Sequence, residues 1–427
     1  MSFITNIRSV AKYESKILVR SWFFRIFTLL AVVFLGFFNF AMMLMEDNFG
    51  LWFAKSVSSN IPYLNLLLLN TGQAVVAVFL SSEFLKRDKK LDTSEVFYVR
   101  PLSNAEYVVG KIWGNLRVFL FLNLLVLAIV LAFNFMASGV TVDLPAYLVY
   151  FFLISIPTLI FIIGLSIFLM LLLKNQALTF IFLLGYIGLT LFYIQDKFYY
   201  LFDYMVYNLP LFKSTIVGFS NLELILNHRA IYFFAGLGFI FFTIFLFKRL
   251  PNARRSHYPW LFLSFCMFLL MVTAGFRHVR SILWEGEMRA LYTSINNKYV
   301  YEPKMAIDYY DISVEQKSET IRSVVGMEGT ALAASEVFIF CLNPGLRVEE
   351  VKDGEKSLNF KREEQILAVD FGRKIEKGDT ISFSVSYEGR IKDDFCYLDI
   401  PEEVLQQPHD KEMLKLDKKY SFQTSDY

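Results

Sequence analysis

The chain has 427 residues, of which 55% are hydrophobic and only 19% are charged, and its formal net charge at pH 7 is +2. Soluble domains carry roughly 25% charged residues, so the composition excludes an ordinary soluble protein, and the near-neutral charge gives no basic surface for nucleic acid. Residues 1–276 hold 21 Lys and Arg against 12 Asp and Glu, whereas residues 277–427 hold 21 and 28. This asymmetry predicts two regions in different compartments.

The first 25 residues predict an amphipathic helix that lies along a membrane surface. At 100° per residue, its cations spread over about 120° of one side; they are Arg8, Lys12, Lys16 and Arg20. The apolar residues of the other side are Phe3, Ile7, Val10, Ile17 and Leu18. Glu14 is an exception on that side. Such a helix directs its cations to anionic headgroups, and it either anchors the topology or transmits motion into the membrane.

Seven apolar stretches follow, and each is long enough to cross a bilayer, which takes about 20 mostly apolar helical residues. The predicted spans are Ile26–Met45, Tyr63–Ser81, Val118–Met136, Ala146–Leu173, Ala177–Ile194, Ile231–Phe247 and Trp260–Phe276. Short cytoplasmic loops are enriched in Lys and Arg. A cytoplasmic N-terminus places 17 of the 21 Lys and Arg of residues 1–276 inside. Seven crossings then place residues 277–427 outside the cell.

Residues 83–111 form a predicted cytoplasmic segment that is too long for a tight turn and has no apolar run able to cross. We expect a short helix that starts near Asp92 and is interrupted at Pro101. Ser103 and Glu106 have the spacing of a capping box that opens the next helix. An ordered basic loop is the alternative.

The order of residues in this segment resembles the coupling-helix region of type-2 ABC exporter permeases, which docks on an ATPase. The residues that carry the resemblance are Thr93, Glu95, Arg100, Pro101, Ser103, Glu106, Gly110 and Lys111. That family also begins with an amphipathic helix. It typically has six spans, with partly re-entrant helices outside before the sixth, where residues 195–229 fit; the seventh span departs from the pattern. The resemblance implies an ATPase partner, a homodimer or a second permease, and the bacterial cytoplasmic membrane.

The chain has no G-x-x-x-x-G-K-[ST] phosphate loop, so any ATP would be bound by the partner and not by this chain. The second span is the most polar, and its polar residues are Asn65, Asn70, Thr71 and Gln73. These side chains would either line a translocation path or join helices through hydrogen bonds.

Residues 277–427 alternate polar and apolar side chains as strands do, most clearly in 310–315, 367–371 and 381–387. Val337–Leu342 is a continuous apolar run, as in a strand covered on both faces. Turn signals at residues 343–345, 352–354 and 377–379 separate the strands. The pattern predicts an antiparallel β-sandwich. The expected fold is thus a membrane α-helical bundle, with an interface helix (1–25), a permease-like domain (26–257) and an added span (258–276), followed by an all-β domain.

Residues 341–360 and 374–391 resemble the N-terminal β-domain of aminopeptidase N-like zinc peptidases, where it precedes a thermolysin-like catalytic domain. Such peptidases need H-E-x-x-H, but none of the four histidines stands four residues from another. We therefore expect no catalysis and no metal in this chain. We also expect the β-domain to be incomplete, with zinc only in a missing catalytic part. Cys341 and Cys396 are expected to be buried thiols, or alternatively a disulfide.

Two functions follow. The chain is expected to be the permease subunit of an ABC-type exporter powered by a separate ATPase. The alternative is a membrane-anchored peptidase or binding module, whose spans only hold it in place.

Overall fold

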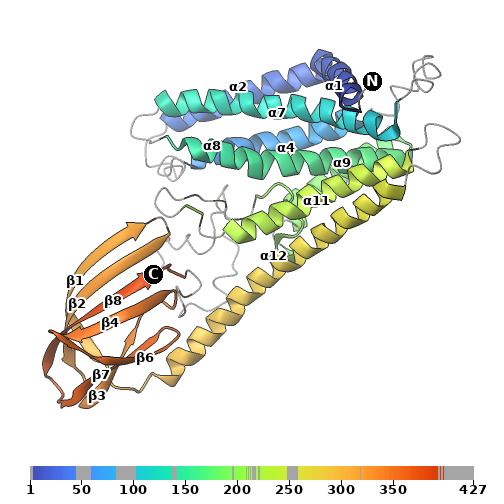
Figure 1. Ribbon diagram of the computed structural model, residues 1–427. Helices are drawn as coiled ribbons and strands as arrows, with labels where there is room; N and C mark the ends of the chain where they lie inside the picture. Colours follow the sequence, from blue (N-terminus) through green and yellow to red (C-terminus); the bar gives the residue numbers. More distant parts are fainter. Residues whose placement is uncertain are drawn as a thin grey trace, which may run out of the picture. The chain divides into compact units, whose positions relative to one another are not determined.

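The computed structural model is shown in Figure 1. It describes residues 3–44, 59–82, 102–136, 142–194, 197–207, 209, 211, 213, 218–219, 222–247, 258–317, 319–392, 395 and 398. The chain divides into two compact units, a helical unit up to Val279 and a β unit from Arg280.

Within the described residues, seven helical segments are long and apolar enough to cross a membrane. The helices are α1 (Phe3–Arg20), α2 (Trp22–Leu44), α4 (Asn60–Ser82), α7 (Asn104–Met136), α8 (Leu144–Tyr150), α9 (Ile156–Leu173), α10 (Gln176–Leu189), α11 (Leu222–Leu246) and α12 (Tyr258–Lys298). Helix α1 has the amphipathic character expected of the N-terminal segment, and the other eight supply the seven segments because α8 and α9 are joined into one. The sequence therefore identified the spans but not all of their ends.

Helix α7 begins at Asn104, where the predicted capping box opens it, but two other helices begin or end far from their predicted limits. Helix α11 begins at Leu222, although residues 195–229 were expected to lie outside the sixth span. Helix α12 continues to Lys298, where a junction had been predicted after Phe276. Apolarity marks the part of a helix that lies in lipid, whereas the polar ends of these helices are stabilised by packing against other protein elements.

The fourth span is continuous but irregular. A π-helical turn, η2 (Phe151–Ser155), joins α8 to α9 just before Pro157. Proline has no N–H to donate to the carbonyl one turn earlier, so a local change of helical pitch at this point is expected. The turn leaves backbone oxygens of the α8–α9 junction available to other elements.

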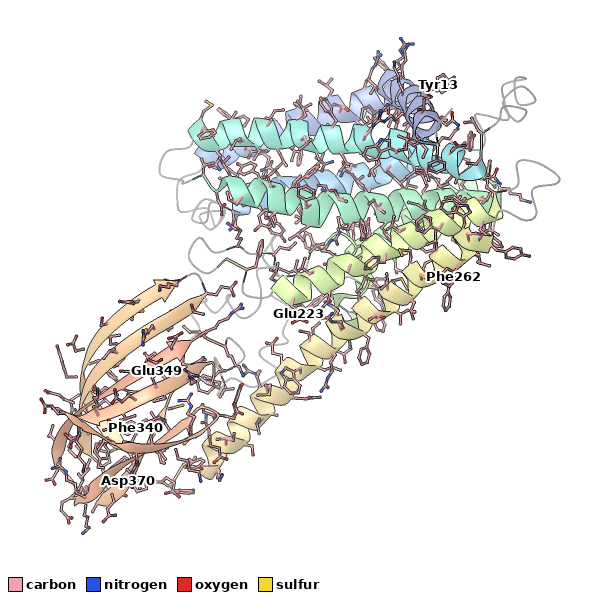
Figure 2. The ribbon with its side chains drawn as sticks, viewed as in Figure 1. Tyr13, Glu223, Phe262, Phe340, Glu349 and Asp370 are labelled. Carbon is pink, nitrogen blue, oxygen red and sulfur yellow. The ribbon has the colours of Figure 1, made fainter. Side chains whose placement is uncertain are left out.

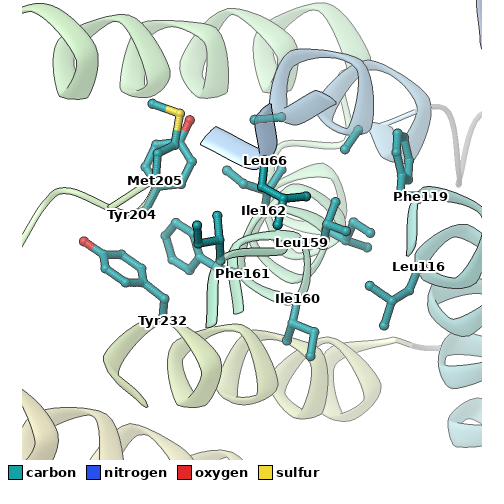
Figure 3. Packing of buried hydrophobic residues seen from close by; sticks show 14 of the residues in the cluster. Leu66, Leu116, Phe119, Leu159, Ile160, Phe161, Ile162, Tyr204, Met205 and Tyr232 are labelled. Carbon is teal, nitrogen blue, oxygen red and sulfur yellow. The ribbon is translucent and has the colours of Figure 1, made fainter. Parts of the chain in front are cut away.

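Helix α9 lies at the centre of the helical unit and packs closely against α11. A Cβ atom on Gly164 would lie 2.6 Å from the Gly236 carbonyl oxygen, and a Cβ on Gly236 would lie 2.7 Å from the backbone of Ile160. Small residues at such a crossing allow two membrane helices to approach closely. Figure 3 shows the core around this helix, with Leu159–Ile162 of α9 surrounded by residues of other elements, among them Leu66 and Tyr232.

Outward-facing side chains of the helical unit are mostly apolar. Phe262 on α12 is 67% exposed and is labelled in Figure 2. In an 18-residue apolar stretch of α12 that could cross a membrane, only 11% of the residues are buried inside the protein. A helix with apolar residues on its exposed face suits contact with lipid.

The β unit consists of two antiparallel sheets. The strands are β1 (Met305–Lys317), β2 (Thr320–Ala331), β3 (Ser335–Cys341), β4 (Leu346–Asp353), β5 (Lys356–Ser357), β6 (Asn359–Glu363), β7 (Ile366–Ile375) and β8 (Thr380–Gly389). One sheet has the order β1-β2-β8-β4-β5 and the other has the order β3-β7-β6. Antiparallel pairing and the three predicted turns are confirmed; Gly354 and Gly378 in two of them have φ of +60° and +93°.

The two sheets share one core. The ring of Phe383 in the larger sheet lies 5.1 Å from that of Phe340 and 5.5 Å from that of Phe371, both in the smaller sheet. The prediction that Val337–Leu342 is covered on both faces is wrong. Phe338 on one face of β3 is fully buried, while Val337 on the other face is 39% exposed. A run of apolar residues therefore did not distinguish a strand that is covered on both faces from one that is covered on a single face.

Cys341 is a free thiol and is exposed, so its predicted burial is also wrong. Cys396 lies outside the described residues. Partial desolvation raises the pKa of the Cys341 thiol, although the positive charge of Arg362 acts in the opposite direction.

The last turns of α12 are fixed to the smaller sheet. The amide of Gln365 donates to the Tyr292 carbonyl over 2.7 Å and to the Asn296 side chain over 2.9 Å. Glu363 accepts hydrogen bonds from Tyr299 at 2.5 Å and from Lys298 at 2.9 Å. These two donors hold the pKa of the Glu363 carboxyl below its ordinary value.

Candidate functional site

The N-terminus of α7 follows directly after the predicted coupling segment, and it is capped as expected. The backbone N–H of Ser103 donates to Glu106 Oε2 over 2.6 Å, and the N–H of Glu106 donates to Ser103 Oγ over 3.1 Å. This reciprocal pair is a capping box. It confirms the helix start that the sequence predicted at Ser103–Glu106.

The same turn of α7 is fixed to two other helices. Glu106 Oε1 accepts a hydrogen bond of 2.8 Å from Asn6 on α1. Asn104 donates to the carbonyl of Phe247, just after α11, over 2.6 Å. The rings of Tyr107 and Phe247 stack 5.4 Å apart. The residues after the coupling segment therefore join α1, α7 and the end of α11.

Helix α1 packs closely against α7. A Cβ atom on Gly110 would lie 2.7 Å from Val10 Cβ, and one on Gly114 would lie 2.7 Å from Glu14 Cβ and 2.9 Å from the Ala11 carbonyl oxygen. Real Cβ atoms do not approach this closely, so both positions require glycine. The G-x-x-x-G spacing of small residues is the pattern that permits close helix contact in membranes.

Glu14, the charged exception on the apolar side of α1, has a buried partner on α7. Its Oε1 lies 3.1 Å from Lys111 Nζ, and the two side chains are only 4% and 1% exposed. Lys111 also lies 5.0 Å from the centre of the Tyr107 ring. A charge that is buried in this way requires a close partner of opposite sign.

Arg117 completes the α1–α7 contact. It donates to Ser15 Oγ over 2.5 Å and to the Ala11 carbonyl over 2.8 Å. Ser15 in turn donates to the Gly114 carbonyl over 2.7 Å. We call the residues of this contact the α1–α7 clamp: Val10, Ala11, Glu14 and Ser15 on α1, with Gly110, Lys111, Gly114 and Arg117 on α7.

The structure describes half of the predicted coupling residues. Ser103 and Glu106 form the cap, and Gly110 and Lys111 are buried under α1. The other four lie outside the described residues: Thr93, Glu95, Arg100 and Pro101. The four cations of the interface helix are all exposed, as expected; they are Arg8, Lys12, Lys16 and Arg20. Among the described residues, Gly110 and Lys111 are therefore placed to connect helices and not to contact a partner.

The polar residues of the second span are joined to residues on other helices. Asn123 on α7 donates to Gln73 over 2.8 Å, and Ser155 in η2 donates to Asn123 over 2.7 Å. Gln73 donates to Asn70 over 2.6 Å, and Asn70 donates to Ser155 over 3.2 Å. All four side chains belong to fully buried residues. We call them the buried amide network.

Asn65 and Thr71, the other two polar residues predicted in this span, form different kinds of hydrogen bond. Asn65 forms a reciprocal pair with Asn39 on α2, with hydrogen bonds of 2.7 and 3.0 Å. Thr71 is partly exposed and donates to Leu67 of its own helix over 2.9 Å. Interhelical hydrogen bonding is therefore confirmed for Asn65, Asn70 and Gln73. A translocation path along them stays a prediction.

Arg229 was expected in an outside loop, but it lies inside α11 and is only 2% exposed. Its guanidinium donates to the carbonyls of Leu153 and Tyr204 over 2.7 and 2.9 Å, and to Thr158 Oγ1 over 2.8 Å. Leu153 is the residue whose carbonyl lacks the N–H of Pro157. The π turn thus provides an acceptor for a buried cation, which would otherwise be very costly.

Sequence reasoning missed Arg229 and the buried amide network for a common reason. An ionisable residue bounded by apolar residues on both sides is a signal that could have placed Arg229 inside a helix. Asn123 and Ser155 are polar residues within apolar spans, and the same signal applies to them. Which of these residues meet depends on how the helices pack, and their spacing along the chain does not reveal it.

No protein-family model matches the sequence. No curated protein sequence shows significant similarity to it either. The function is therefore argued from the residues and their geometry.

Proposed function

We propose that this chain is the membrane-spanning permease subunit of an ABC-type exporter, powered by a separate ATPase that docks on residues 83–111. In this proposal the N-terminus is cytoplasmic, the protein resides in the bacterial cytoplasmic membrane, and the β unit is an extracytoplasmic domain of the aminopeptidase N-like type. The permease acts as a homodimer or with a second permease, and ATP is bound by the partner.

The observation that supports this proposal best is the connection made by the first turn of α7. A docking segment can drive a membrane protein only if its displacement reaches the helices. Glu106 and Asn104 bond to α1 and to the end of α11, and the α1–α7 clamp extends the contact through a buried ion pair. A force applied just before Ser103 would thus move three elements together, because packed elements move as rigid bodies.

A membrane-anchored binding or peptidase module is the second candidate, and the buried amide network favours it. Asn65, Asn70 and Gln73 of α4 bond to one another or to residues of other helices, and they are buried. Side chains that are joined in this way suit a static anchor, because their polar groups are already used within the protein. The permease proposal requires these hydrogen bonds to rearrange during transport.

Capture of the ATPase distinguishes the two candidates. The double substitution Glu95→Ala/Arg100→Ala should reduce co-purification of a candidate ATPase subunit, because contact charges set register and partner choice. Surface substitutions usually change stability by about 0.5 kcal/mol or less, so membrane expression should be normal.

The matched control is Lys374→Ala/Glu376→Ala, which removes an exposed ion pair of the β unit with side chains 62% and 63% exposed. It should capture as much ATPase as the wild type. Undiminished capture and transport by the Glu95→Ala/Arg100→Ala variant would reject residues 83–111 as the docking segment. No ATPase capture by the wild type itself would favour the anchored module.

A further inference from the structure

Two of the four histidines meet in the helical unit, although 50 positions separate them in the sequence. His228 lies on α11 and His278 on α12, and both residues are fully buried. Their ring centres are 5.1 Å apart, with 52° between the ring planes. Spacing along the sequence does not reveal this pair, because each helix contributes only one of the two histidines.

Each imidazole is oriented by a backbone carbonyl. His278 Nε2 lies 2.8 Å from the Tyr199 oxygen, and His228 Nε2 lies 3.0 Å from the Tyr200 oxygen. A carbonyl only accepts, so Nε2 must carry the proton in both rings, and Nδ1 of the neutral ring then carries a lone pair. Both Nδ1 atoms are buried and lack a hydrogen-bond partner.

The two carbonyls come from a strained turn. Phe198, Tyr199 and Tyr200 have φ of 52°, 58° and 62°, so three consecutive residues other than glycine are left-handed. Left-handed backbone is unfavourable for such residues, and strain of this kind persists where function requires it. A buried nitrogen without a hydrogen-bond partner is a further cost. A ligand that used both Nδ1 atoms would offset these costs.

We propose that His228 and His278 bind one divalent first-row transition-metal ion, such as Cu²⁺ or Zn²⁺, through their Nδ1 atoms. Imidazole is a preferred ligand of these metals. Metal-binding histidines characteristically donate their other N–H to a carbonyl, as both rings do here. Metal–nitrogen distances of about 2.0–2.1 Å and tetrahedral angles place two ring centres about 5 Å apart, which agrees with the observed 5.1 Å.

The surroundings of the pair define the rest of the site. Arg229 repels positive charge at His228, while the buried carboxylate of Asp203 attracts that guanidinium. The site should prefer Cu²⁺ to Zn²⁺, because nitrogen ligands bind Cu²⁺ more tightly.

The test uses the full-length protein in detergent, loaded with Cu²⁺, dialysed and examined for bound copper and by electron paramagnetic resonance. The wild type should retain about one ion per chain, with hyperfine splitting from two imidazole nitrogens. His228→Gln and His278→Gln should each lower the affinity about tenfold or more and remove one nitrogen from the spectrum. Zn²⁺ should compete with the bound Cu²⁺.

His257→Gln and His409→Gln are the matched controls, because they remove the two histidines that lie outside this pair. Both should retain copper and the wild-type spectrum. Wild-type protein that retains no more copper than the His228→Gln/His278→Gln double variant would overturn the proposal, as would a spectrum that only the control substitutions change. These outcomes do not depend on transport, since the assay measures only bound metal.

Discussion

At the scale of single residues, the α1–α7 clamp accounts for the charged residue Glu14 on the apolar side of α1. Glu14 broke the apolar side of a predicted surface helix, and the structure places it against Lys111 with both side chains almost completely buried. The two glycines of α7 allow this approach because a Cβ at either position would overlap α1. Glu14, the charged residue that did not fit the apolar side of α1, is therefore the residue that forms the ion pair with α7.

We predict that Lys111→Met lowers the free energy of unfolding by about 3–5 kcal/mol, because it leaves the Glu14 carboxylate buried without its partner. The double variant Glu14→Gln/Lys111→Met should be clearly more stable than Lys111→Met alone, since no charge is then left unpaired. Chemical denaturation of the full-length protein in detergent measures both. Equal destabilisation of the single and double variants would contradict a direct ion pair.

At the scale of secondary-structure elements, the contacts between elements depend on where the helices begin and end. Helix α12 continues beyond its apolar part, and its last turns bond to the smaller sheet through Gln365 and Glu363. Helix α7 starts well before its apolar part, and there it holds α1 and the end of α11. In both cases the polar extension carries the contacts to other elements.

We predict that acid loosens the contact between the end of α12 and strands β6 and β7. The pKa of Glu363 is lowered by Tyr299 and Lys298, so the stabilisation is present above the ordinary glutamate pKa of about 4.3. It is lost as the pH falls through the lower folded value. Hydrogen exchange of the β6–β7 peptides, corrected for intrinsic rates, should show this loss below about pH 4.

The Glu363→Gln variant should show no such pH step, because it has no carboxyl group to protonate. Glu376→Gln removes an exposed carboxylate of the same unit and should keep the wild-type profile. A step of equal size in Glu363→Gln would show that another group is responsible.

At the scale of the whole molecule, the division into a helical unit and a β unit is the feature that the composition already indicated. The described residues contain seven membrane-compatible segments followed by two antiparallel sheets. If these seven segments are all the crossings, the two ends of the chain lie on opposite sides of a bilayer. The charge distribution then predicts a cytoplasmic N-terminus.

We predict that the β unit is outside the cell and that residues 83–111 are inside it. In a variant without native cysteines, Lys377→Cys lies in an exposed turn, so an impermeant maleimide should label it in intact cells. Ser94→Cys should be labelled only after permeabilisation. Labelling with the opposite pattern would contradict the topology, and labelling of both sites in intact cells would contradict an odd number of spans.

The sequence by itself determined the spans, the β strands, their turns and the capping box at Ser103, because these depend on local periodicity and on residues a few positions apart. Tertiary structure alone decided which polar residues meet. The partners Glu14 and Lys111, Asn70 and Asn123, and His228 and His278 come from different helices. Hydrophobic periodicity fixes which face of a helix is apolar, but packing between helices fixes which residues share a buried contact. The proposed coupling and the proposed metal site both depend on contacts that packing between helices determines.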